Sequence, residues 1–308
     1  MLRVTVDVFS GRPNPQWILP FDDASNLLQR IANTPEVIEH ADSATLGLGY
    51  RGLKIDLISD GLHREMRLPA SFRVLSRTAA GDEVVNLILR SASSTGAVLN
   101  LHGANLDELQ KFVPEASKEL SFKFPEFRVI DLDWIQHILE ILRKYIEWLR
   151  KGGCKHEEIP FDPAFWNDPT HVTHNNCYNF ATNRRTDTFA QPGRASGHQA
   201  ITINCSHVSA AAISDGAIQA PPCPPDAQAP RYLVALVQAP VFSPSWPYPD
   251  YHWYRRCSDG FWAHKPGGTP ARNYDNSGHT IYDPETCDRG PYVNFCGFLY
   301  TQKKMVVS

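Results

Sequence analysis

Two histidines in the carboxyl-terminal part of the chain lie in short aromatic segments that are separated by a turn. The segments are Asp250–Arg256, which contains His252, and Gly260–Lys265, which contains His264. The intervening Cys-Ser-Asp-Gly ends in an Asp-Gly pair, which predicts a β-hairpin when alternating aromatic residues flank it. We therefore expect His252 and His264 on neighbouring strands. Imidazole can take up and release a proton near neutral pH, so the pair is a candidate for acid–base chemistry.

A cysteine farther upstream is the candidate nucleophile. The run Asn175-Asn176-Cys177-Tyr178-Asn179 predicts a short helix that Asn175 or Asn176 caps, with Cys177 in its first turn. The exposed N–H groups and the positive dipole end there favour thiolate over thiol, so we expect a lowered thiol pKa and a nucleophile at neutral pH. The competing interpretation is a structural cysteine, because free Cys also packs as a small hydrophobic side chain.

Composition describes an ordinary globular protein. The chain has 308 residues, of which 42% are hydrophobic and 20% are charged, and this length favours two domains over one. A net charge of −3 gives no reason to expect a nucleic acid or an anionic membrane as a partner. We expect no membrane span, since no apolar run approaches the roughly 20 residues that a span needs. The amino terminus lacks signal-peptide architecture, so the location is unknown, with the cytoplasm as the default and non-classical export open.

Cysteine usage distinguishes the two halves of the chain. All seven cysteines lie in the second half, at positions 154, 177, 205, 223, 257, 287 and 296. An odd number allows a free thiol beside up to three disulfides, or seven reduced thiols. Without a signal sequence, the reduced state is the default expectation.

The first half of the chain predicts a small α+β domain over residues 1–130. Alternating and amphipathic patterns predict strands at 3–9, 53–58 and 84–89, a helix near 22–31, and a helix from Asn105 that Pro114 interrupts or ends. No catalytic motif occurs in this part. Its role is left open.

The second half predicts a junction helix followed by a helix-and-sheet domain. Apolar residues at helical spacing predict a packing helix within 131–155, which Gly152-Gly153 ends. The domain then spans 156–308. Its expected elements are the helix of Cys177, a helix at 206–213, a strand at 232–237, the two histidine strands and a final strand near 293–300.

This order of elements resembles the core of the papain-like superfamily, and more specifically the NlpC/P60 type of cell-wall amidopeptidase. The resemblance covers only the carboxyl-terminal part of the chain. It implies that Cys177 is the nucleophile, that His252 is the general base and that His264 orients His252. Asn176 and Tyr178 replace the family's usual neighbours of the cysteine, so the resemblance implies the chemistry more than a peptidoglycan substrate.

Other residues are open candidates for the supporting roles. Asn273, Asp275 or His279 could be the third member in place of His264. An oxyanion hole needs donors that point at the developing negative charge. Asn175, Gln199 and the backbone N–H of Cys177 are candidates for it.

A metal site is the other chemistry to weigh. His171, His174 and Cys177 are ligand types at short spacing, and His198, Cys205 and His207 follow. The chain has no Cys-x2-Cys pair and no His-Glu-x-x-His, and these residues fall in expected loops. We therefore expect no metal and no cofactor.

These observations predict a two-domain α+β protein with a papain-like, NlpC/P60-like carboxyl-terminal domain. The expected activity is cysteine-dependent amide hydrolysis through a thioester, on a peptide, peptidoglycan or another amide, with acyl transfer possible on the same residues. The alternative is a non-enzymatic binding or toxin-accessory module. In that case the cysteine is structural and the Tyr/Trp-rich segment 246–262 forms a recognition surface.

Overall fold

The chain forms a mixed α+β protein with two antiparallel sheets. The computed structural model describes residues 1–40, 47–58, 68–76, 78–94, 96–120, 156–221, 232–241 and 247–308, with isolated positions between 139 and 150. The chain divides into two compact units. Unit 1 comprises Met1–Phe9, Pro13–Phe124 and Val241–Tyr248, and unit 2 comprises Ser10–Arg12, Pro125–Pro240 and Pro249–Ser308.

The units are interleaved in sequence. The sequence predicted two continuous domains, 1–130 and 156–308. In the structure, unit 2 also contains Ser10–Arg12 and unit 1 also contains Val241–Tyr248. The predicted junction helix at 131–155 lies almost entirely outside the described residues. None of the helices in the described part of the chain has the length and apolar character needed to cross a bilayer.

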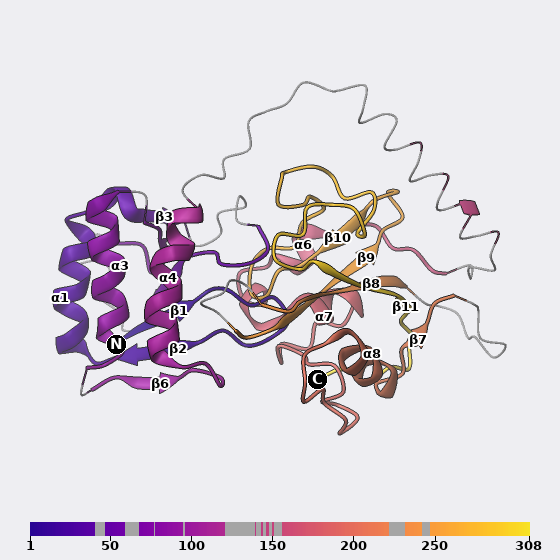
Figure 1. Cartoon of the computed structure of the whole chain (residues 1–308), viewed down its shortest axis with the longest axis horizontal. Coiled ribbons are helices and arrows are strands. Elements are labelled where there is room, and N and C mark those ends of the chain that lie inside the picture. Colours follow the sequence, from indigo (N-terminus) through magenta and orange to yellow (C-terminus); the bar gives the residue numbers. More distant parts are fainter. Residues whose placement is uncertain are drawn as a thin grey trace. The chain divides into compact units, whose positions relative to one another are not determined.

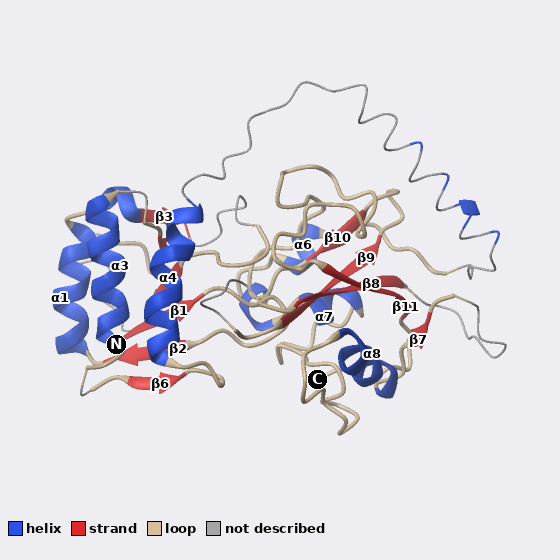
Figure 2. Cartoon of the chain, in the orientation of Figure 1, coloured by secondary structure: helices blue, strands red, loops and turns tan. Residues whose placement is uncertain are grey.

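Unit 1 is a sheet covered by helices. Its strand order is β3-β5-β4-β1-β2-β6, with β1 (Leu2–Val6), β2 (Gln16–Leu19), β3 (Ile38–His40), β4 (Leu53–Leu57), β5 (Ser71–Val74) and β6 (Val98–Asn100). The helices are α1 (Phe21–Ala32), α3 (Ala79–Ser91) and α4 (Leu106–Leu120), with a 3₁₀ turn at Pro35–Val37. Figures 1 and 2 show the three helices side by side in front of the sheet. Apolar residues of strands and helices form one core cluster.

Two predictions for this unit are wrong. The expected strand at 84–89 is the middle of α3, where Val84, Val85, Ile88 and Leu89 are buried on one helical face. The Thr78 side chain caps this helix by accepting a hydrogen bond from the Gly81 N–H. Burial of a helical face here outweighs the strand preference of the β-branched residues. Helix α4 also continues through Pro114 instead of ending there.

A buried ionic group in unit 1 joins the end of β1, the segment before β4, and β5. The Asp7 carboxylate lies 2.6 Å from both the Arg51 and the Arg73 guanidinium groups. Burial disfavours ionisation of Asp7, but the two cations outweigh that effect and hold its pKa well below the ordinary value.

Unit 2 is a five-stranded sheet with short helices. The strand order is β10-β9-β8-β11-β7, with β7 (Ile218–Gln219), β8 (Leu233–Ala239), β9 (Asp250–Arg256), β10 (Trp262–His264) and β11 (Asn294–Tyr300). The helices are α6 (Pro163–Trp166), α7 (Cys177–Ala181) and α8 (Cys205–Ser214), with a 3₁₀ turn at Val172–His174. The predicted order of helices and strands in this part of the chain is therefore confirmed.

The two faces of the unit 2 sheet differ in character. Strand alternation turns Tyr251 and Trp253 toward α7 and α8, where they join the apolar cluster that contains Cys177. The same alternation turns His252 and Tyr254 to the opposite face. His264 pairs with Tyr254 across the β9–β10 ladder and so shares that face.

The described part of unit 2 contains a disulfide. It joins Cys205, at the start of α8, to Cys296 in β11. The expectation that all cysteines are reduced is therefore wrong for this pair. Cys177, Cys257 and Cys287 are free thiols, and Cys154 and Cys223 lie outside the described residues.

Candidate active site

His252 and His264 form a buried dyad on neighbouring strands. His252 Nε2 lies 2.8 Å from His264 Nδ1, and neither residue is exposed to solvent. The Tyr254 ring stacks on His264 with its centroid 5.0 Å away, and Tyr292 borders His252 at 5.7 Å. The predicted hairpin is confirmed, and these aromatic neighbours hold both imidazole planes in place.

The second nitrogen of His264 determines where the dyad's proton resides. His264 Nε2 lies 3.0 Å from the Tyr274 carbonyl oxygen, to which only a protonated nitrogen can donate. In that tautomer Nδ1 accepts from His252 Nε2, which makes His252 Nδ1 a basic nitrogen. Arg272 Nε, 3.2 Å from the same His264 nitrogen, favours the opposite tautomer. We adopt the first tautomer, because the carbonyl contact is the shorter of the two.

Cys177 begins α7, as predicted, and an asparagine capping box fixes the helix start. The Asn176 side chain accepts from the N–H groups of Tyr178 and Asn179, while the Asn179 side chain accepts from the Asn176 N–H. This reciprocal arrangement satisfies donors that the first turn would otherwise leave without partners. The capping box therefore fixes the backbone position of Cys177 at the start of α7.

The predicted lowering of the Cys177 pKa is wrong. Burial raises the pKa of the thiol well above its ordinary value, and the nearby Asp250 carboxyl raises it further. Hydrogen bonds from the Trp253 and Cys177 N–H groups and the charge of Lys265 act in the lowering direction, but they are the smaller effects. Since α7 has only five residues, its dipole cannot offset complete desolvation.

The thiol meets β9 at the backbone, next to His252. Its donor, the Trp253 N–H, belongs to the peptide bond that links His252 to Trp253. The Cys177 side chain is packed in the cluster on the α7 face of the sheet, whereas the His252 ring extends from the opposite face. Cysteine and histidine are thus adjacent through the strand backbone.

Lys265 connects the segment of the cysteine to the segment of the histidines. Its fully buried ammonium group donates to the carbonyl oxygens of Val172, Asn175 and Gly267, the last two at 2.6 and 2.9 Å. Lys265 directly follows His264, and Asn175 lies two residues before Cys177. These hydrogen bonds therefore fix the approach to α7 against the end of β10. In the sequence, the only signal for this role of Lys265 is its position directly after the strand that ends at His264.

The two side chains predicted for the oxyanion hole do not point at the thiol. Asn175 Nδ2 donates to the His171 carbonyl and to Asp187, and its oxygen accepts from the Asp187 N–H. The amide of Asn175 is therefore fully used within its own loop. Gln199 is exposed, unlike the buried Cys177.

Of the predicted third members, His264 is the residue that the structure brings to His252. The Asp275 carboxylate accepts from the N–H groups of Ser277, His279 and Asp288, so it organises the loop after β10. Asn273 contributes its carbonyl oxygen to the Ile281 N–H in the same loop. The Asp275 side chain is thus used within this loop, and Asn273 takes part in the loop through its main chain.

The aromatic segment does not form the predicted recognition surface. Tyr251, Trp253, Tyr254 and Trp262 are all buried in unit 2. They pack around the sheet and provide apolar walls for the polar residues near Cys177. In the described part of segment 246–262, these four aromatic side chains are therefore not available as the recognition surface of a binding module.

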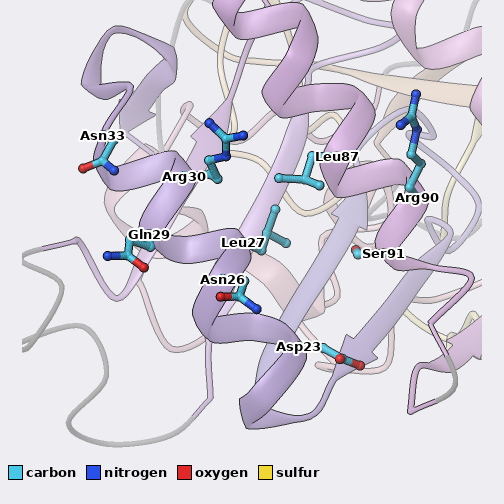
Figure 3. Close-up of a pocket in the computed structure, with 9 residues that line it drawn as sticks. All are labelled: Asp23, Asn26, Leu27, Gln29, Arg30, Asn33, Leu87, Arg90 and Ser91. Carbon is cyan, nitrogen blue, oxygen red and sulfur yellow. The ribbon is translucent and has the colours of Figure 1, made fainter.

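Unit 1 has a separate groove of about 680 Å³ between α1 and α3. Leu27 and Leu87 extend from the two helices at its centre, and Arg30 and Arg90 lie toward one end (Figure 3). None of the predicted catalytic residues lines this groove.

The fold and the buried residues define an α+β protein whose second unit packs a cysteine-bearing helix on an antiparallel sheet with a histidine dyad. A comparison of sequences finds insoluble matrix shell protein 1 of Ruditapes philippinarum, which is 45% identical over 141 residues. The similarity spans 45% of this chain and 87% of that protein. The chain therefore belongs to the family of insoluble matrix shell protein 1. No family model and no solved structure matches the chain.

Proposed function

We propose that unit 2 is a papain-like, cysteine-dependent amide hydrolase, with Cys177 as nucleophile and His252 as general base. The observation that carries the proposal is the His252–His264 hydrogen bond of 2.8 Å, next to the strand backbone that holds the Cys177 thiol. Buried polar side chains are costly, so their concentration in a small core is typical of functional sites.

The proposed reaction follows from the raised pKa of the thiol. Cys177 is neutral at rest and lies on the face of β9 opposite to the His252 ring. The proposed reaction therefore requires a rearrangement at β9 that brings the thiol within reach of His252 Nδ1, to which its proton passes as sulfur attacks the amide carbonyl carbon. The carbon–nitrogen bond then breaks, and His252 returns the proton to the departing amine. Water hydrolyses the thioester and restores the thiol. His264 accepts the His252 Nε2–H throughout and so keeps the imidazole in one tautomer.

Substrate cleavage tests the proposal. A mixture of unrelated peptides is incubated with the wild-type chain, and new termini are identified by mass spectrometry. We expect Cys177→Ala to abolish cleavage, and Cys257→Ala, a matched change at another buried free thiol, to preserve it. His264→Asn retains an acceptor for His252 and should keep more activity than His264→Leu. Equal cleavage by the wild type and Cys177→Ala would exclude the mechanism.

A structural role is the second candidate, and the shell protein relative favours it. Under this proposal the chain is a matrix component in which Cys177 packs in the core. It predicts that no cleavage depends on Cys177, and that Cys177→Ala and Cys257→Ala destabilise unit 2 to a similar degree.

A further inference from the structure

Three residues from the amino-terminal region form an integral part of unit 2. Ser10, Gly11 and Arg12 follow the first strand of unit 1 by only a few residues, yet they belong to the compact unit that contains Cys177. Ser10 and Gly11 are buried. The segment is therefore held inside a different unit from the residues on either side of it.

The Asp250 carboxylate accepts hydrogen bonds from the backbone N–H groups of this segment. It accepts from Ser10 at 2.6 Å and from Gly11 and Arg12 at 3.3 and 3.2 Å. Tyr292 donates its hydroxyl to the same carboxylate. Asp250 is fully buried, and burial raises its pKa even though these donors act in the opposite direction.

The carbonyl oxygen of Gly11 accepts hydrogen bonds from three side chains. They are Asn176 Nδ2 at 3.0 Å, Gln191 Nε2 at 2.7 Å and the Tyr251 hydroxyl at 3.0 Å, whose single hydrogen is shared with Gln191 Oε1 at 3.0 Å. Asn176 directly precedes Cys177, and Tyr251 and Asp250 both interact electrostatically with the Cys177 thiol. The bound carbonyl thus lies among the immediate neighbours of the candidate nucleophile.

Ser10 and Gly11 are held through their main chain, whereas the Arg12 guanidinium also donates to the Pro249 carbonyl oxygen at 2.9 Å. The Ser10 hydroxyl is buried without a hydrogen bond among the described residues, and Gly11 has no side chain. A Cβ atom on Gly11 would lie 2.6 Å from Tyr251 Cδ2 and Cζ, so only glycine fits at that position. The surrounding residues therefore select a peptide backbone with glycine at its centre.

We infer that Asp250, Asn176, Gln191 and Tyr251 form a binding site for glycine-containing peptides, which Ser10–Arg12 fills from within the chain. The inference rests on the proposed function only in naming this peptide class as the substrate. The resident segment covers Cys177 and keeps the site closed. Displacement of the segment admits a peptide in its place.

Alkylation of Cys177 tests this inference without requiring catalysis. Iodoacetamide labelling of Cys177 and Cys257 is followed by mass spectrometry in the wild type, in Gly11→Ala and in Gly197→Ala. Gly197→Ala is the control for general destabilisation by a glycine-to-alanine change. A Cβ at Gly197 meets no atom within 4 Å, and the φ of +78° there means that the change strains the backbone without a side-chain clash. We expect Gly11→Ala to accelerate Cys177 labelling about tenfold, corresponding to an opening favoured by about 1.4 kcal/mol. Cys257 in that variant, and both thiols in Gly197→Ala, should label at the wild-type rate.

A second variant and a peptide complete the test. Tyr251→Phe removes one donor to the Gly11 carbonyl without added bulk and should accelerate Cys177 labelling to a smaller extent. The peptide acetyl-Phe-Ser-Gly-Arg-Pro-amide should slow Cys177 labelling in Gly11→Ala, and the same peptide with valine for glycine should not.

The inference is overturned if both thiols accelerate together in Gly11→Ala, since the segment is then a general anchor of the fold. It is also overturned if Cys177 labelling is unchanged, or if the glycine peptide gives no protection. Protection by the peptide without any Cys177-dependent cleavage would instead exclude the proposed function while leaving the binding site in place.

Discussion

His252 Nε2 and His264 Nδ1 are 2.8 Å apart in the buried interior of unit 2. Only one proton can lie between two nitrogens at that distance, so the tautomers of the two rings are coupled. The ring contacts of Tyr254 and Tyr292 restrict both imidazoles. The dyad therefore has two discrete protonation patterns, and they differ in which nitrogen of His252 is basic.

We predict that His252 carries its proton on Nε2 and His264 carries its proton on Nε2. The Tyr274 carbonyl, 3.0 Å from His264 Nε2, favours this pattern. Nitrogen-15 chemical shifts of histidine-labelled protein report the tautomers directly, with His252→Gln and His264→Gln used for assignment. Protonation of His252 on Nδ1 would show that Arg272 controls the dyad and would remove the basic nitrogen that the mechanism needs.

Local patterns predicted the hairpin and the cysteine helix, because short-range physics determines both. The Asp-Gly turn positions His252 beside His264, and Asn176 caps α7 from the adjacent position. The run at Val84–Leu89 misled the prediction because tertiary burial of a helical face decided its conformation. The thiol pKa was wrong for a related reason: helix position is visible in the sequence, but complete burial is not.

Contacts between distant parts of the chain could not be predicted. Asp250 binds the N–H of Ser10, a residue 240 positions away, and nothing near either residue indicates the other. Pairing of Cys205 with Cys296 is equally hidden, since seven cysteines permit many connectivities. The choice of His264 over Asn273 and Asp275 required the strand register and the loop hydrogen bonds together.

Lys265→Met should destabilise unit 2 by about 3–5 kcal/mol, because it leaves three buried carbonyl groups without their charged donor. The loss should be greatest near Val172–Asn175, the approach to Cys177. Hydrogen exchange of the amides in this segment and in α7 measures it. Lys303→Met is the control, since Lys303 is exposed. Equal exchange in the two variants would show that Lys265 does not hold the segment.

Reduction of the Cys205–Cys296 disulfide should lower the stability of unit 2. The bond joins residues separated by 91 positions, and closure of a loop of that size stabilises a fold by about 4–5 kcal/mol. The double variant Cys205→Ser/Cys296→Ser should shift the urea midpoint downward. Cys287→Ala, at a free thiol, controls for loss of a sulfur atom. An unchanged midpoint in the double variant would argue that the bond does not constrain the unfolded chain.

Asp7→Asn should destabilise unit 1 by about 3–5 kcal/mol, because it leaves the buried Arg51 and Arg73 cations without their carboxylate. The pKa of Asp7 is depressed in the folded chain, so its stabilisation is complete above the unfolded value of about 3.9 and is lost as pH falls through the depressed value. The difference in unfolding free energy between the wild type and Asp7→Asn should therefore be constant from pH 7 to about pH 5 and shrink in stronger acid.

Asp56→Asn provides the matched comparison for this prediction. Asp56 pairs with Lys54 at 3.1 Å on the same sheet, but both side chains are partly exposed, so the change should cost about 1 kcal/mol or less. Hydrogen exchange of β1 and β4 amides, measured in the full chain at several pH values, reports unit 1 specifically. A loss of similar size in both variants would mean that the Asp7 carboxylate compensates only its own desolvation, and that the two arginines remain stable through their carbonyl contacts.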